Sequence, residues 1–203
     1  MSKWDKLPNQ ETINKTVEAL AANGINAKFV QNGEEARKEV FALIPKGAEI
    51  MNMTSVTLDT LGIAQEIVES GRYNSVRKKL TSMDKDTQGL AMLKLGAAPE
   101  WVIGSIHAIT EDGHVLIASQ GGSQLPAYVF GSAHVIWVAG AQKIVKNNDE
   151  GIKRIYEHCL PLEIERAKKV YGKGSSVNKI LIIDKEVKQN RIDLIIVGEV
   201  LGF

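Results

Sequence analysis

The sequence has very little cysteine. Cys159 is the single cysteine among 203 residues. One thiol forms no internal disulfide and cannot supply the four thiolates of a zinc or iron–sulfur centre within one chain. No histidine pair has helical metal spacing and no zinc motif is present. We therefore expect a cytoplasmic protein in a reducing compartment, without a metal site or an evident cofactor motif.

The sequence also lacks an excess of charge of either sign. Lys and Arg number 25 against 24 for Asp and Glu, which gives a net charge of +1. Such a chain has no global positive field to gather nucleic acid or an anionic membrane. The one local basic cluster, Arg77 with Lys78 and Lys79, is expected to be a solvated surface. No apolar run approaches the ~20 residues that cross a bilayer, and the polar N-terminus predicts no export signal.

The pattern that is present predicts one globular domain over residues 1–203. Hydrophobic residues make up 44% and charged residues 24%, as in soluble domains of this size. Helical and strand-like segments alternate, which predicts an α/β fold with a mainly parallel sheet covered by helices on both faces. The expected helices are 11–22, 34–43, one from the turn at 52–55 to Gly71, 86–95, 126–130 and 147–171. The expected strands are 26–30, 48–53, 101–109, 114–118, 134–139 and, as a final two-strand extension joined by a polar turn, 179–183 and 194–197.

One candidate ligand loop is Gln120-Gly121-Gly122-Ser123-Gln124, between a predicted strand and a short helix. Glycines let the backbone approach a ligand, and amides at a helix start favour phosphate or carboxylate. The alternative is a tight turn that needs positive φ. Thr54 and Ser55 carry hydroxyls that suit either a ligand oxygen or a helix cap. Ligands of parallel sheets bind beyond the carboxyl ends of the strands, where such loops converge.

A second candidate is the turn Thr110-Glu111-Asp112-Gly113. A carboxylate at a strand end suits a nucleophile or a base, which makes Glu111 a candidate catalytic residue. Asp-Gly is also the strongest short hairpin signal, and the residues alone favour that alternative. His107 lies within a predicted strand, where a hydrogen-bonded core histidine is commoner than a base. Cys159 is interpreted as a packing residue.

Several segments, in order, resemble the LUD (lactate-utilisation, LutC-like) domain. The main segment runs from Gly104 through Ser105-Ile106-His107-Ala108-Ile109 to Glu111-Asp112-Gly113, with Ser119-Gln120 and Leu125-Pro126 after it. Further similarity lies at 54–58 with 61–63, at 159–163, and from 177–180 to 198–203. Together these segments span nearly the whole chain.

The resemblance implies the fold of CoA transferases, ribose-5-phosphate isomerases, glucosamine-phosphate deaminases and formyltetrahydrofolate cyclo-ligases. Family I CoA transferases carry a nucleophilic Glu in a Glu-Asn-Gly-like turn, and Glu111-Asp112-Gly113 is similar, with Asp for Asn. LUD proteins are associated with oxidation of lactate to pyruvate alongside iron–sulfur partner proteins. A redox role of this chain would need such partners.

Two functions remain open from the sequence. The first is an enzyme or enzyme subunit of hydroxy-acid or acyl metabolism that acts on a small anionic metabolite. Its candidate catalytic residues are Glu111 and His107, and its candidate ligand-binding residues are Thr54, Ser55, Gly104, Gln120, Gly121, Gly122 and Ser123. The second is a non-catalytic metabolite-binding or assembly module, in which Glu111 is only a turn residue. Assembly into a homo-oligomer is also open.

Overall fold

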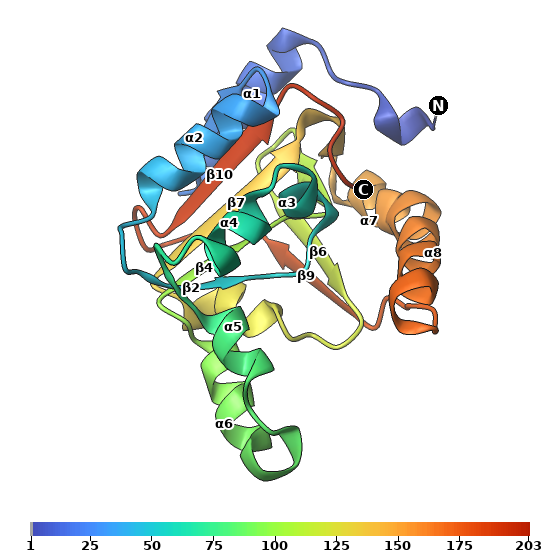
Figure 1. Ribbon diagram of the computed structural model, residues 1–203. Coiled ribbons are helices and arrows are strands. Elements are labelled where there is room, and N and C mark those ends of the chain that lie inside the picture. Colours follow the sequence, from blue (N-terminus) through green and yellow to red (C-terminus); the bar gives the residue numbers. More distant parts are fainter. Residues whose placement is uncertain (1) are drawn as a thin grey trace.

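The protein is described by a computed structural model that covers residues 2–203 and holds two sheets among helices (Figure 1). The α-helices are α1 Gln10–Ala22, α2 Gly33–Leu43, α3 Val56–Thr60, α4 Ile63–Glu69, α5 Val76–Thr81, α6 Lys85–Ala97, α7 Asn148–Arg154 and α8 Leu160–Tyr171. Short 3-10 turns are η1 Lys3–Asp5 and η3 Ala141–Lys143, and π-helical turns are η2 Ala127–Gly131 and η4 Ile155–Cys159. The strands are β1 Asn26–Val30, β2 Glu49–Asn52, β3 Asn74–Ser75, β4 Trp101–Gly104, β5 Ala108–Thr110, β6 Val115–Ser119, β7 His134–Gly140, β8 Ile144–Val145, β9 Lys179–Ile183 and β10 Ile192–Val197.

The larger sheet has six strands in the order β1-β10-β7-β4-β2-β3, and every pairing is parallel. Its central strands are apolar at nearly every position because both faces are covered. In β10, Leu194 and Ile196 join the core formed with α1 and the second sheet, whereas Ile195 and Val197 join the core under α2, α3 and α4. The predicted α/β class with a parallel sheet is confirmed.

The second sheet has four strands in the order β8-β5-β6-β9 and is mixed. Ile109 and Val115 face the larger sheet, and Ala108 and Leu116 face η4 at Ile155. The larger sheet is therefore covered by helices on one face and by α1 with a second sheet on the other. In Figure 1, α7 and α8 flank the smaller sheet, while α6 projects away from both sheets beyond α5.

The prediction of a single strand over 101–109 is wrong. β4 lies in the larger sheet between β2 and β7, and β5 lies in the smaller sheet between β6 and β8. Both strands are buried on both faces, so the apolar run continues across the break and gives no sign of it. The three residues between them, Ser105, Ile106 and His107, form a loop where the chain passes between the sheets.

The expected C-terminal two-strand extension is also wrong. β9 pairs antiparallel with β6 at the edge of the smaller sheet, and β10 lies between β1 and β7 inside the larger one. Their exposure explains the difference: every position of β9 is exposed or half-buried, whereas β10 is buried almost throughout. Only a central strand requires burial on both faces.

Three helical boundaries differ from the pattern. The helix expected after the turn at 52–55 divides into α3 and α4 at Gly62, which has φ +65°. The segment between Gly71 and the helix expected over 86–95, for which no helix or strand was expected, contains β3 and α5. The long helix over 147–171 does begin at the cap Asn147, but a π-helical turn precedes Pro161, which has no N–H to donate and crowds the preceding turn.

Within residues 2–203, no helix combines the length and apolar character that a bilayer span requires.

Candidate functional site

A cavity of about 940 Å³ lies beyond the carboxyl ends of β2 and β4, within the usual range for small-molecule sites. Its walls come from the segments after β2, β4 and β6, from η3, from η4 with α8, and from α6. The cavity thus lies where ligands of parallel sheets usually bind, beyond the carboxyl ends of the strands. The predicted residues that line it are Thr54, Ser55, His107, Gln120, Gly121, Gly122 and Ser123; Gly104 and Glu111 do not.

Lys143 is part of the wall and is 1% exposed. It ends η3, the turn that follows β7. Its Nζ donates to Ser105 Oγ at 3.1 Å and to the Ile106 carbonyl at 2.9 Å. Ser105 Oγ in turn lies 3.3 Å from Thr57 Oγ1. These three side chains make a connected polar group in the cavity wall.

The electrostatic setting of Lys143 is unusual for a lysine. Burial, and then the neighbouring Arg154 cation, lower the pKa of Lys143 to about 7. No carboxylate oxygen of residues 2–203 lies within 4.0 Å of Nζ. A substantial fraction of Lys143 is therefore neutral at physiological pH, unlike that of an exposed lysine.

His107 lies in the β4–β5 loop and also lines the cavity. Its Nδ1 accepts a hydrogen bond from the Ala118 amide at 3.1 Å, so the ring proton is on Nε2. Burial, together with the cations of Lys143 and Arg154, lowers the pKa of His107 to about 3. His107 is therefore a neutral, hydrogen-bonded wall residue that can donate a hydrogen bond from Nε2.

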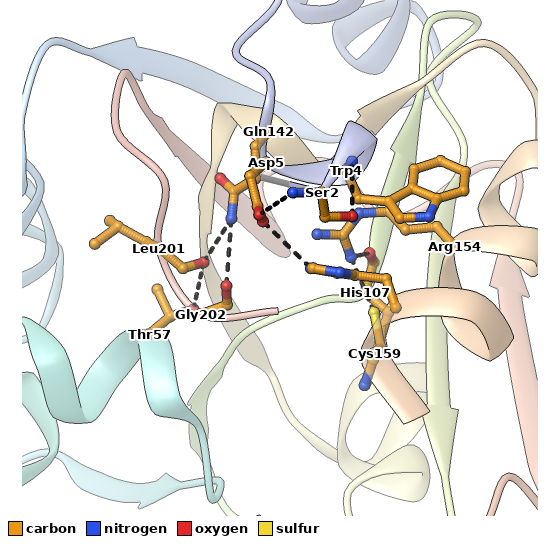
Figure 2. Close-up of polar contacts among 11 residues, drawn as sticks. Ser2, Trp4, Asp5, Thr57, His107, Gln142, Arg154, Cys159, Leu201 and Gly202 are labelled. Atoms are coloured by element: carbon orange, nitrogen blue, oxygen red, sulfur yellow. Dashed lines mark hydrogen bonds and ion pairs between the residues drawn. The ribbon is translucent and has the colours of Figure 1, made fainter. Parts of the chain in front are cut away.

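Arg154 lies behind this wall and is fully buried. Its Nη1 donates to the His107 carbonyl at 2.6 Å and lies 2.9 Å from Cys159 Sγ. Figure 2 shows Arg154 among Trp4, His107 and Cys159. Burial raises the pKa of the Cys159 thiol, which keeps it protonated and fits the interpretation of Cys159 as a packing residue.

The loop after β6 is a tight turn that also lines the cavity. Ser119 Oγ accepts from the Gly122 amide at 2.8 Å and donates to Gln124 Oε1 at 2.9 Å. Gly122 has φ +86°, and a Cβ there would approach Lys179 Cδ to 2.8 Å. A Cβ at Gly121 would meet nothing within 4 Å. The helix expected after this loop is the five-residue turn η2, so the expected helix-dipole contribution to anion binding is not available.

The hydroxyl-rich turn after β2 caps α3 and also forms part of the cavity wall. Ser55 Oγ accepts from the Leu58 amide at 3.3 Å, which is an N-cap, and Thr54 and Ser55 line the cavity. Behind them the C-terminal segment is held in place, because Gln142 Nε2 donates to the Leu201 carbonyl at 3.0 Å (Figure 2). This contact brings Phe203 to the cavity wall.

Gly104 acts on the cavity through Tyr128. A Cβ at Gly104 would lie 1.8 Å from Tyr128 Oη, so only glycine leaves room for this tyrosine. Tyr128 lines the cavity, and its ring packs edge-on against Trp137 with centroids 5.6 Å apart. Burial raises the pKa of Tyr128 above its usual range, so its hydroxyl stays protonated.

Glu111 lies in the hairpin turn between β5 and β6. The Gly113 amide donates to the Thr110 carbonyl at 2.9 Å and closes the turn. The Glu111 carboxylate is 3.4 Å from Lys15 Nζ on α1, and Asn23 at the end of α1 donates to the Gly113 carbonyl at 3.1 Å. The turn is therefore docked on α1, away from the residues that line the cavity, and its geometry is that of the alternative hairpin interpretation.

The cavity carries more positive than negative side chains. Apart from Lys143, which is partly neutral, its charged residues are the cations Arg77, Lys85 and Arg166 and the carboxylates Asp59 and Glu163. Arg166 is neutralised by Glu163 through two hydrogen bonds of 2.7 Å. Arg77, expected on a solvated surface, instead donates to the Asn52 carbonyl at 2.6 and 3.1 Å and faces the cavity. This excess of cations favours an anionic ligand.

The chain belongs to the LUD domain family, whose model matches residues 13–197. Among solved structures it is similar to a DUF162 family protein from Deinococcus radiodurans, with 13% identity over 95% of this chain and 100% of that one and a TM-score of 0.57. A further match is eIF2B beta from Chaetomium thermophilum, with 13% identity, 69% and 46% coverage and a TM-score of 0.32. No curated protein matches the chain significantly. The first structural likeness supports the fold.

Proposed function

We propose that the cavity binds a small anionic metabolite of carbon metabolism, either a hydroxy acid or an acyl or phosphate compound. Membership of the LUD family supports a protein of the lactate-utilisation type. The observation that carries the proposal is the excess of cations around a cavity also lined by hydroxyls such as Thr54, Ser55 and Ser123. Cations and hydroxyls together bind carboxylate or phosphate oxygens.

Oxidation of lactate to pyruvate removes two electrons and two protons. The electrons need an acceptor, and iron–sulfur partner proteins would fill that role if the chain is one subunit of a lactate-oxidising system. In that arrangement the cavity holds the hydroxy acid or its product.

The alternative is a metabolite-binding or assembly module without catalysis. The observation that favours it is the position of Glu111, whose carboxylate pairs with Lys15 and does not line the cavity. The carboxylate nucleophile implied by the transferase-like turn is thus absent from the cavity wall. In this case the same cavity binds a ligand and no turnover follows.

A ligand panel tests the proposal. L-lactate, pyruvate, CoA esters and sugar phosphates are screened by thermal shift, with lactamide as the neutral match of lactate, and the hits are followed by calorimetry and by mass spectrometry for turnover. We expect binding of an anionic compound and none of lactamide. Lys85→Gln should weaken that binding, whereas the matched change Lys146→Gln at an exposed lysine outside the cavity should not. The proposal would be overturned if lactate and lactamide bound equally well. It would also be overturned if no compound of the panel bound.

A further inference from the structure

The amine of Lys143 is held by two hydrogen-bond acceptors, which leave its lone pair unused. A neutral amine has two hydrogens and one lone pair. Ser105 Oγ and the Ile106 carbonyl accept both hydrogens at 3.1 and 2.9 Å. The lone pair is then not engaged by either acceptor, and the amine belongs to a residue that forms part of the cavity wall. No carboxylate of residues 2–203 lies within 4.0 Å to hold the amine as an ammonium ion.

We propose that Lys143 forms an imine with a small aldehyde or ketone that carries an anionic group. The inference rests on the proposed function, because the carbonyl compound must first bind in the cavity. It also narrows the ligand class: the carbonyl carbon lies at Lys143 Nζ, and the cations Arg77 and Lys85 elsewhere on the cavity wall favour an anionic group on the same compound.

The step balances without an oxidant or a reductant. Nζ attacks the carbonyl carbon, a C–N bond forms, and one amine proton moves to the oxygen to give a carbinolamine. The C–O bond then breaks, and the second amine proton leaves with the hydroxyl as water. Ser105 Oγ is hydrogen-bonded to Nζ and lies 3.3 Å from Thr57 Oγ1. This pair of hydroxyls provides a short route for both proton transfers.

The surroundings of Lys143 favour the neutral amine. Burial and the Arg154 cation lower its pKa to about 7, and desolvation next to another cation is a known way to activate a lysine nucleophile. Arg154 is itself fixed by its bond to the His107 carbonyl at 2.6 Å. Lys146, which is exposed and lies outside the cavity, lacks this setting.

Reductive trapping tests the proposal. The full chain is incubated with pyruvate, with dihydroxyacetone phosphate, or with acetone as a neutral ketone, each with sodium cyanoborohydride, and its peptides are analysed by mass spectrometry. We expect one reduced adduct, at Lys143, with an anionic ketone and none with acetone. Comparison of the two anionic probes tells a carboxylate site from a phosphate site. The adduct should be lost in Lys143→Met and kept in the matched variant Lys146→Met.

The pH dependence distinguishes a reactive lysine from a surface one. Trapping at Lys143 should level off about one pH unit above its pKa of about 7, where its amine is mostly neutral, whereas trapping at exposed lysines keeps rising towards their usual pKa near 10.4. Ser105→Ala provides a second variant should Lys143→Met not fold, and it should slow trapping at Lys143 while binding of the probe persists.

The outcomes separate the two proposals. Calorimetric binding of pyruvate or dihydroxyacetone phosphate without an adduct at Lys143 overturns the imine and leaves the proposed function standing. Adducts spread evenly over surface lysines, unchanged in Lys143→Met, also overturn the imine. Absence of both binding and adduct with every anionic compound overturns both proposals.

Discussion

Substitution of Gly104 by alanine tests whether this glycine exists to make room for Tyr128. The added Cβ would lie 1.8 Å from Tyr128 Oη and 3.0 Å from its Cζ, whereas ordinary van der Waals contact begins near 3.4 Å. Tyr128 is 1% exposed and its ring is fixed against Trp137, so it cannot swing away freely. Overpacking of this kind costs about 1–3 kcal/mol. The clash is with a buried ring, so we expect Gly104→Ala near the upper end of that range.

Equilibrium urea unfolding, followed by circular dichroism, measures the loss. Tyr128→Phe removes the Oη atom and with it the closest contact, so Gly104→Ala combined with Tyr128→Phe should recover about 1 kcal/mol relative to the sum of the single changes. Gly121→Ala is the matched control, because a Cβ there meets nothing within 4 Å and its free energy of unfolding should stay within about 0.5 kcal/mol of wild type.

Two results would refute this reasoning about Gly104. One is a Gly104→Ala variant as stable as Gly121→Ala, which would mean that Tyr128 moves without cost. The other is strict additivity in the double variant, which would mean that the cost arises elsewhere, for example at Met53, whose Cβ would lie 3.3 Å from the new methyl group.

Three further predictions follow from the same contacts. Gly122→Val should lose about 1–3 kcal/mol, because φ is +86° and a Cβ would press on Lys179, and it should weaken binding of an anion; unchanged urea unfolding and calorimetric affinity would contradict both. Glu111→Gln should change stability by about 0.5 kcal/mol or less and leave calorimetric binding in the cavity intact; loss of turnover by a folded variant would instead restore Glu111 as a catalytic residue. Between pH 7 and 10 the unfolded chain keeps the Lys143 proton that the folded chain releases, so wild-type stability should rise relative to Lys143→Met by up to about 1.4 kcal/mol per pH unit; parallel pH profiles of urea unfolding would show that the Lys143 pKa is not lowered.

The alternation of strands and helices was predictable because each element carries its own period and caps. The strand over 26–30 and the helix before Asn23-Gly24 match the structure, since Gly24 at φ +79° provides the expected stop. The division of 101–109 into β4 and β5 was not predictable. Both halves are buried on both faces, and hydrophobicity reports burial without saying which sheet provides it.

The position of the cavity was predictable from strand ends, whereas the choice between its two candidate loops was not. Both Glu111 and Gln120 follow predicted strands of similar character. In the structure the strands β5 and β6 run antiparallel. The carboxyl end of β5 and the carboxyl end of β6 therefore lie at opposite ends of this strand pair. The sequence predicts a mainly parallel sheet, in which both ends would meet on one side, and the Asp-Gly hairpin signal at 110–113 is the alternative that the antiparallel pairing of β5 with β6 matches.

Lys143 shows the limit of the sequence most clearly, because nothing around it marks a buried amine. It follows Gly140-Ala141-Gln142 at the end of a strand, where a lysine is ordinarily solvated. Its burial depends on contacts from far along the chain: Ser105 and the Ile106 carbonyl reach it from the β4–β5 loop, and Gln142 holds the C-terminal segment over the same turn through the Leu201 carbonyl. A lowered pKa arises only when these segments meet, since each alone leaves the amine in water. A lysine of this kind can therefore be identified only in the folded structure, as a buried cationic side chain that has no carboxylate nearby.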